Sequence, residues 1–153
     1  MSIGAVDHIN LVVSDLTRSL HFYRDLLGFP ETKRAVLTGD WIEAVVGLRG
    51  VHADVVFVQP PGDGPRLELI QYHAPTGAAF EPNRLPHTLG LRHIAFRVTE
   101  LDAMQARLSA AGVRFLSPGI AVPGGVVKHD SGHKRLCYFH DPDGVLLELA
   151  EYT

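Results

Sequence analysis

The 153-residue chain contains a single cysteine, Cys137, and this scarcity excludes two kinds of structure. One thiol cannot form a disulfide within the chain, and it cannot build a cage of several thiolates around a metal. So little cysteine also suits a reducing compartment, so we expect a cytoplasmic protein. Any bound metal must therefore be held by histidine, aspartate or glutamate side chains.

Basic clusters and long apolar runs are missing as well. Lysine and arginine are scattered and the net charge is −3, so the electrostatic signature of a nucleic-acid-binding protein is absent. The apolar runs fall far short of the ~20 residues that span a bilayer, and no basic stretch precedes an apolar segment at the N-terminus. We therefore expect a small-molecule partner rather than a nucleic acid or a membrane.

Two stretches of the sequence occur twice. The segment DHINLVVSDL (7–16) matches RHIAFRVTEL (92–101), and RLELIQY (66–72) matches LLELAEY (146–152). Self-similarity of this kind indicates a duplicated supersecondary unit. Because each match occurs only twice, we predict a pair of modules rather than a repeat array.

Each predicted module contains a strand, a helix and three further strands. Alternating apolar residues predict the strands, and apolar residues at helical spacing predict the helices. Ser14 or Asp15 can cap the first helix, and Thr99-x-x-Asp102 has the pattern of a capping box for the second. The expected elements are strand 8–13, helix 16–27, strands 31–37, 54–58 and 67–72, then strand 91–98, helix 101–111, and strands around Val113, at 135–139 and at 145–151.

These elements predict an α+β fold of two βαβββ modules within one domain, residues 1–153. The modules span about 4–72 and 91–153. The segment 73–90 between them is rich in proline and glycine and lacks periodicity, so it is expected to be a linker. A chain of this length, 46% hydrophobic, can bury a sizeable core.

Four potential metal ligands occupy matched positions of the repeat. His8 and His93 lie near the start of the first strand of each module, and Glu68 and Glu148 lie between two leucines of the last strand. Since successive strand residues point to opposite faces, the leucines face the core and these four side chains face away from it. A lone polar residue on such a face is usually just solvated, but here the pair is repeated. If the modules pack with approximate twofold symmetry, the four groups converge in a concave site that suits a divalent metal.

The chain resembles the vicinal oxygen chelate superfamily, which includes glyoxalase I, methylmalonyl-CoA epimerase, extradiol ring-cleaving dioxygenases and bleomycin-resistance proteins. The segments VDHINLVVSDLTRSLHFYRDLLGF, LRHIAFRVTELD and YFHDPDGVLLELAE carry the likeness. The resemblance implies an incomplete barrel with a metal-binding cleft, a homodimer, and metal ligands at the four positions named above. It also favours the glyoxalase and epimerase members, because the ring-cleaving dioxygenases have no glutamate at the position of Glu68.

The expected reaction is proton transfer next to a metal-bound carbonyl. A divalent ion such as Ni, Co, Zn, Mn or Fe would polarise the carbonyl of a substrate with two neighbouring oxygens and stabilise an enediolate. Glu68 and Glu148 are the expected catalytic residues that carry the proton. The sequence therefore predicts a lyase or isomerase of the glyoxalase and epimerase type, and it does not distinguish which glutamate is the base.

An iron-dependent extradiol dioxygenase is an alternative. The pattern V-x-H…C-Y-x-x-D-P-x-G-x-x-x-E, which contains His129, Tyr138 and Glu148, resembles the signature of those enzymes except at Cys137. The resemblance implies that His129 and Tyr138 would assist the reaction beside the metal. An exposed loop histidine is the commoner explanation of His129.

A non-catalytic protein that binds an aromatic natural product is a third possibility. Bleomycin-binding members of the superfamily lack the metal ligands. Such a protein would still bind its small-molecule ligand after a chelator has removed any metal. Its cleft would be lined by Trp41, Tyr72 and Tyr152. Arg66 and Arg97 could meet an anionic substrate group, although solvated surface charge is the commoner role for such residues.

Overall fold

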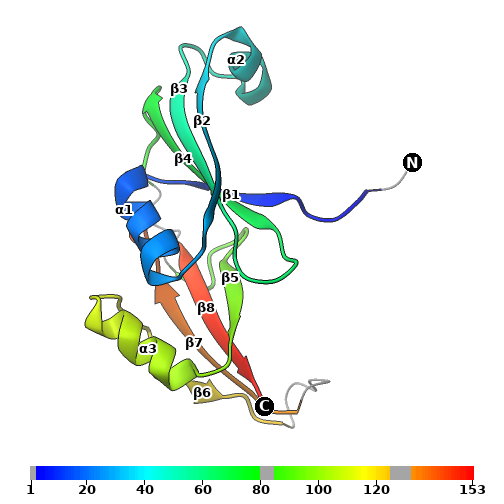
Figure 1. The fold of residues 1–153 in the computed structure, drawn as a ribbon, viewed down its shortest axis with the longest axis vertical. Coiled ribbons are helices and arrows are strands. Elements are labelled where there is room, and N and C mark those ends of the chain that lie inside the picture. The colour runs from blue at the N-terminus through cyan, green and yellow to red at the C-terminus, as the bar shows by residue number, and fades with distance from the viewer. Residues whose placement is uncertain (1–2, 80–84, 125–131) are drawn as a thin grey trace. The chain divides into compact units, whose positions relative to one another are not determined.

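The structure is a computed structural model that describes residues 3–79, 85–124 and 132–153. Contacts between residues divide the chain into two compact units, Met1–Ala79 and Phe80–Thr153, called here the first and second unit. Each unit contains one four-stranded mixed sheet with a helix after its first strand (Figure 1). The predicted α+β fold of two repeated modules is therefore confirmed.

The first unit follows the predicted order with one added helix. Its sheet has the strand order β1-β4-β3-β2, with β1 parallel to β4 and the other neighbours antiparallel. Its elements are β1 (His8–Val12), α1 (Leu16–Leu20), a π-helical segment η1 (His21–Leu26), β2 (Glu31–Thr38), α2 (Asp40–Val46), β3 (His52–Val58) and β4 (Arg66–Ala74). The predicted helix 16–27 is thus an α-helix that continues as a π-helix. Gly28 follows it with a φ of 78°, the left-handed conformation expected at that position.

The second unit repeats the plan with the strand order β5-β8-β7-β6. Its elements are β5 (His93–Val98), α3 (Leu101–Ala110), β6 (Ile120–Ala121), β7 (Lys134–His140) and β8 (Leu146–Tyr152). The strand predicted around Val113 is displaced along the chain, where Phe115 forms an isolated antiparallel bridge with Phe139 of β7. The Val113 N–H donates instead to the Leu108 carbonyl at 3.0 Å, which closes the end of α3, and the short strand β6 pairs with β7 further along the chain.

No helix in the described ranges is long and apolar enough to cross a membrane.

The start of α1 is held by two side chains. Asp15 is the N-cap residue, and its carboxylate accepts a hydrogen bond from the Arg18 N–H at 3.0 Å, so one of the two predicted caps is confirmed. The N–H of Leu16 donates to Gln71 Oε1 at 2.9 Å. Because Gln71 belongs to β4, this bond ties the first turn of the helix to the last strand of the same unit.

The start of α3 is built in the same way, and the predicted capping box is wrong. Glu100 is the N-cap residue and its side chain makes no capping bond; the N–H of Leu101 donates to Glu151 Oε1 of β8 at 3.0 Å. Asp102 instead accepts hydrogen bonds from Arg135 at 2.7 and 3.0 Å. A charge-assisted pair of this geometry is stronger than a bond to a backbone N–H, so it takes the carboxylate away from the helix end.

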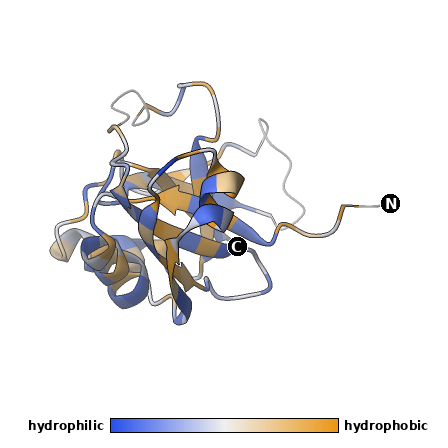
Figure 2. Ribbon diagram, turned by 90° about the horizontal axis from the view of Figure 1, so that it is seen from above, coloured by the Kyte–Doolittle hydropathy of each residue, from blue (hydrophilic) through white to orange (hydrophobic). Residues whose placement is uncertain are grey.

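The strands alternate between a core face and an open face. Leu67 and Leu69 of β4 are fully buried, as are Leu147 and Leu149 of β8, and α1 and α3 contact these two strands. In Figure 2 the strands accordingly change between hydrophobic and hydrophilic colours along their length. Glu68 and Glu148 must lie on the opposite, open faces of their sheets because side chains alternate along a strand.

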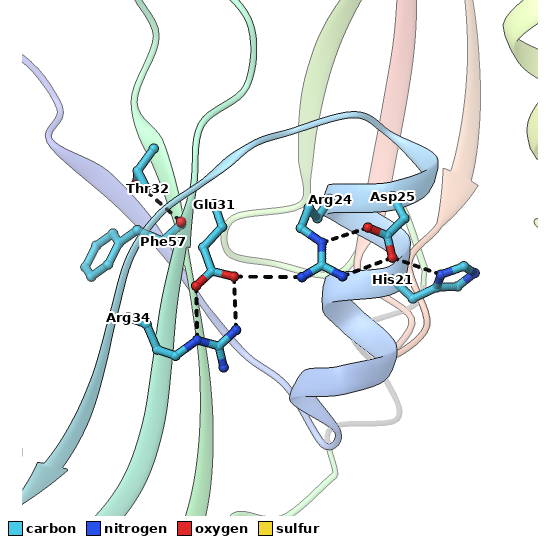
Figure 3. A network of polar contacts seen from close by, with 7 residues as sticks. All are labelled: His21, Arg24, Asp25, Glu31, Thr32, Arg34 and Phe57. Atoms are coloured by element: carbon cyan, nitrogen blue, oxygen red, sulfur yellow. Dashed lines mark hydrogen bonds and ion pairs between the residues drawn. The ribbon is translucent and has the colours of Figure 1, made fainter.

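A polar network connects η1 to β2 on the surface of the first unit (Figure 3). Arg24 donates to Asp25 at 2.7 Å and lies 3.8 Å from Glu31, which is held by Arg34 through two bonds of 3.0 Å. These hydrogen bonds lower the pKa of Asp25 and of Glu31. Because the groups are largely exposed, the network orients the connection and adds little stability.

Candidate functional site

The first unit brings one predicted histidine and glutamate together. The parallel register places Asn10 of β1 beside Glu68 of β4, with His8 on the same open face. His8 Nε2 lies 3.5 Å from Glu68 Oε2, and Asn10 Nδ2 donates to that same oxygen at 2.7 Å. The side chain of His8 is 38% exposed and that of Glu68 is 18% exposed, so the pair is open to solvent.

The orientation of His8 is set by Asp7, a residue that the sequence analysis missed. Asp7 Oδ2 lies 2.8 Å from His8 Nδ1 and accepts a hydrogen bond from Arg66 at 2.6 Å. The hydrogen bonds from His8 and from Arg66 lower the pKa of Asp7. An ionised carboxylate can only accept, so the contact with Asp7 favours a proton on Nδ1, the tautomer in which Nε2 has the lone pair that a metal needs. The position of Asp7 directly before His8 in the sequence was the signal that could have identified it.

The second unit brings together His93 and Glu148 in a similar way. His93 Nε2 lies 3.3 Å from Glu148 Oε2, and the Glu148 side chain is 3% exposed. Lys134 Nζ lies 2.8 Å from the other carboxylate oxygen, Oε1. This contact is an ion pair rather than a well-directed hydrogen bond, because buried Oε1 has no hydrogen-bond partner among the described residues. Burial alone would lower the pKa of Lys134, but the adjacent Glu148 outweighs it and raises that pKa.

Tyr138 lies beside this second pair. The antiparallel register places it opposite Glu148, and its ring centroid is 5.2 Å from that of His93. Burial raises the pKa of Tyr138, and the negative charge of Glu148 adds to the effect. Tyr138 is therefore a neutral phenol next to the carboxylate. His129 lies outside the described residues.

Each pair has the spacing of two ligands of one metal ion. Donor atoms that both lie 2.0–2.2 Å from a common ion are separated by about 3.0–3.6 Å. The distances of 3.5 Å for His8–Glu68 and 3.3 Å for His93–Glu148 fall in this range. Within residues 3–79, 85–124 and 132–153, no three histidine, cysteine, aspartate or glutamate side chains form one group that could hold a metal. The structure thus supplies one pair in each unit, each with an imidazole and a carboxylate.

Both pairs have an aromatic ring with two cations over it nearby; in the first unit these are Lys33 and Arg66 over Phe57. In the first unit Ala53, Val55 and Ile70 form a buried apolar cluster, against which Phe57 and Tyr72 pack. In the second unit two cations, Arg97 and Lys134, lie over the ring of Tyr152. Trp41, the third aromatic residue named for a binding cleft, lies in α2 and is 59% exposed.

The comparison with known proteins decides the family. Residues 5–149 match the model of the Glyoxalase/Bleomycin resistance protein/Dioxygenase superfamily. The chain belongs to this superfamily. The family resemblance described under the sequence analysis is therefore confirmed over nearly the whole chain.

Several known proteins are similar to this chain over most of its length. The uncharacterized protein YaeR of Escherichia coli (strain K12) is 29% identical over 152 residues, which cover 99% of this chain and 98% of that protein. A 2-epi-5-epi-valiolone epimerase of an Actinomyces species is also 29% identical, over 95% of this chain and 78% of the epimerase. The crystal structure of the glyoxalase family protein APC24694 from Bacillus cereus has a TM-score of 0.83 at 26% identity, covering 99% of this chain and 96% of that one.

Proposed function

We propose that the protein is a divalent-metal-dependent enzyme of the glyoxalase and epimerase type, a lyase or isomerase that moves a proton next to a metal-bound carbonyl. The observation that carries this proposal is the His–Glu pair, which occurs in each unit with ligand-like spacing. The superfamily includes enzymes, and the similar epimerase is consistent with this reaction type.

The proposed ligands are His8, Glu68, His93 and Glu148, acting together on one ion. Two neutral nitrogens and two carboxylate oxygens suit Ni, Co, Zn, Mn or Fe. When bound, the ion would supply Lewis acidity for the carbonyl of a small substrate with two neighbouring oxygens. In the second unit, Lys134 contacts the Glu148 oxygen that does not face His93, which leaves Oε2 for a ligand role.

We assign the base to Glu68. Its carboxylate is held by the neutral amide of Asn10 and is partly exposed, whereas Glu148 is buried against the ammonium of Lys134. A carboxylate without a cationic partner accepts a proton more readily, because protonation breaks no ion pair. Glu148, beside Lys134, is better suited to hold the site, and Tyr138 is a neighbouring proton donor.

The extradiol dioxygenase alternative retains one observation in its favour, the contact of Tyr138 with His93. It would require iron, and it would not require Glu68. The homodimer expected from the family resemblance remains a prediction for sedimentation measurements, and a strict monomer at high concentration would contradict it.

Metal analysis of the purified protein tests the proposal. We expect about one non-iron divalent ion per chain, lost in both His8→Ala and His93→Ala, because one shared ion needs both pairs. Two ions per chain, with one lost in each variant, would show separate sites and contradict the shared ion. Absence of metal after reconstitution would refute the enzyme proposal.

Glutamate variants separate the two enzyme alternatives. Glu68→Gln is expected to lower turnover at least ~10²-fold, the usual effect of losing a general base. Glu100→Gln, which changes an exposed glutamate at the start of α3, is the matched control and should retain the metal and the activity. Iron that persists in Glu68→Ala would favour the dioxygenase.

A further inference from the structure

Arg97 lies on the open face of β5, and none of the carboxylates in residues 3–79, 85–124 and 132–153 pairs with it. Its guanidinium carbon lies 4.7 Å from the centroid of the Tyr152 ring. Among the arginines in the described strands, Arg34, Arg66 and Arg135 each pair with a carboxylate, and Arg97 does not. Stacking on the ring holds the guanidinium in place and leaves its N–H donors available to a ligand.

A second cation lies over the same ring. Lys134 Nζ is 5.6 Å from the Tyr152 centroid, and the same ammonium pairs with Glu148 at 2.8 Å. The charge of Lys134 is therefore offset by a buried carboxylate, whereas that of Arg97 is not. This part of the open face keeps a positive charge close to the His93–Glu148 pair.

The internal repeat provides a comparison for these cations. The match of 7–16 with 92–101 places Val12 at the position of Arg97. In the same way Ala53 is opposite Tyr72 in the first unit where Lys134 is opposite Tyr152 in the second. The histidine and glutamate are present in both units, but cations at these two positions occur only in the second, whereas in the first unit Lys33 and Arg66 lie over the ring of Phe57. The first unit forms the same sheet without them, so the fold does not require them.

We propose that Arg97 binds a carboxylate or phosphate group of the substrate, so that the substrate class is an anionic compound with two neighbouring oxygens. The part of this inference that concerns the reacting substrate rests on the proposed function, whereas the anion site itself does not depend on it. The register pairs Arg97 with Ala150, two residues beyond Glu148, a spacing of about 7 Å along the strand. The anionic group would thus lie a few bonds away from the carbon that reacts near Glu148.

Anion binding can be tested on metal-free protein, independently of catalysis. Chelator-treated protein labelled with ¹⁵N at arginine Nε would be titrated with sodium phosphate and, separately, with sodium acetate at constant ionic strength. We expect one arginine Nε–H signal, identified by its absence from Arg97→Gln, to shift saturably with at least one of the two anions. The anion that binds more tightly identifies the substrate group as phosphate or carboxylate.

Two variants make the test specific. Arg97→Lys keeps the charge but loses the planar pair of donors, and we expect at least about 10-fold weaker binding. Arg114→Gln removes an exposed positive charge elsewhere in the second unit and should bind as the unchanged protein does. Binding to Arg97→Lys, which has no Arg97 signal, would be measured by isothermal titration calorimetry beside the unchanged protein and Arg114→Gln. An Arg97 signal that does not shift saturably with either anion, or equal anion affinity in all three proteins, would overturn the anion site. Because the protein is metal-free, that result would leave the metal-site proposal untouched.

Discussion

Replacement of Asp7 tests whether the first pair is built to bind a metal. Asp7 holds His8 Nδ1 at 2.8 Å and is itself fixed by Arg66 at 2.6 Å. In Asp7→Ala the imidazole loses its acceptor, so both neutral tautomers become accessible and the lone pair at Nε2 is no longer favoured. Loss of such a partner typically lowers metal affinity 10- to 100-fold. The His8 side chain is 38% exposed and water can replace the carboxylate, so we expect the lower end, about 10-fold.

The assay has two readouts that a merely structural role would not change together. Competition with a chelator gives the affinity for the divalent ion, and ¹⁵N shifts of the histidine ring report the His8 tautomer. Asp7→Asn keeps a side-chain oxygen but not the charge, so its metal affinity should lie between those of the unchanged protein and Asp7→Ala. Asp63→Ala, in an exposed turn, is the control. Unchanged affinity and an unchanged tautomer in Asp7→Ala would refute the role of Asp7.

Two further predictions concern the second unit. Glu151→Ala should destabilise the protein by about 2 kcal/mol, because the Leu101 N–H loses its buried acceptor. Glu151→Gln should destabilise it by less than half of that amount. The matched residue of the first unit, Gln71, shows that an amide oxygen can accept the same hydrogen bond. Urea unfolding and hydrogen exchange of the Leu101 N–H measure both, and equal losses in the two variants would contradict the cap. Burial, aided by the charge of Glu148, raises the pKa of the Cys137 thiol from its ordinary 9.0 to about 11. Cys137 of the folded protein should therefore not react with a thiol reagent at pH 8. The folded protein holds the thiol proton more tightly than the unfolded chain does, so the free energy of unfolding should fall as the pH rises from 9 towards 11.

The repeat made most of the fold predictable. Alternation along β1, β4, β5 and β8 gave the helix-covered core face correctly, because a helix buries it, but the opposite face of β8 is also buried, as Leu146, Glu148 and Ala150 show. The predictions that failed depended on contacts between distant residues. Asp102 has the spacing of a capping box, but Arg135 lies 33 positions along the chain and takes the carboxylate. Likewise β6 is set by its pairing with β7 rather than by a pattern of its own.

The candidate site shows the same division. Alternation placed His8 and Glu68, and His93 and Glu148, on open faces, and the structure adds that each histidine lies next to the glutamate of its own unit. Spacing along the chain could not show which polar groups hold these pairs. Lys134 meets Glu148 only because β7 and β8 are neighbours in the sheet.

The two pairs differ most in what holds the glutamate, and this difference has a consequence for catalysis. Glu68 is held by a neutral amide and is partly open to solvent, whereas Glu148 is buried beside an ammonium. Protonation of Glu148 would leave the half-buried charge of Lys134 without its partner, which costs free energy. Protonation of Glu68 breaks no such pair. In the proposed reaction the divergence of the duplicated units therefore assigns the change of charge to Glu68, while Glu148 stays paired with the ammonium.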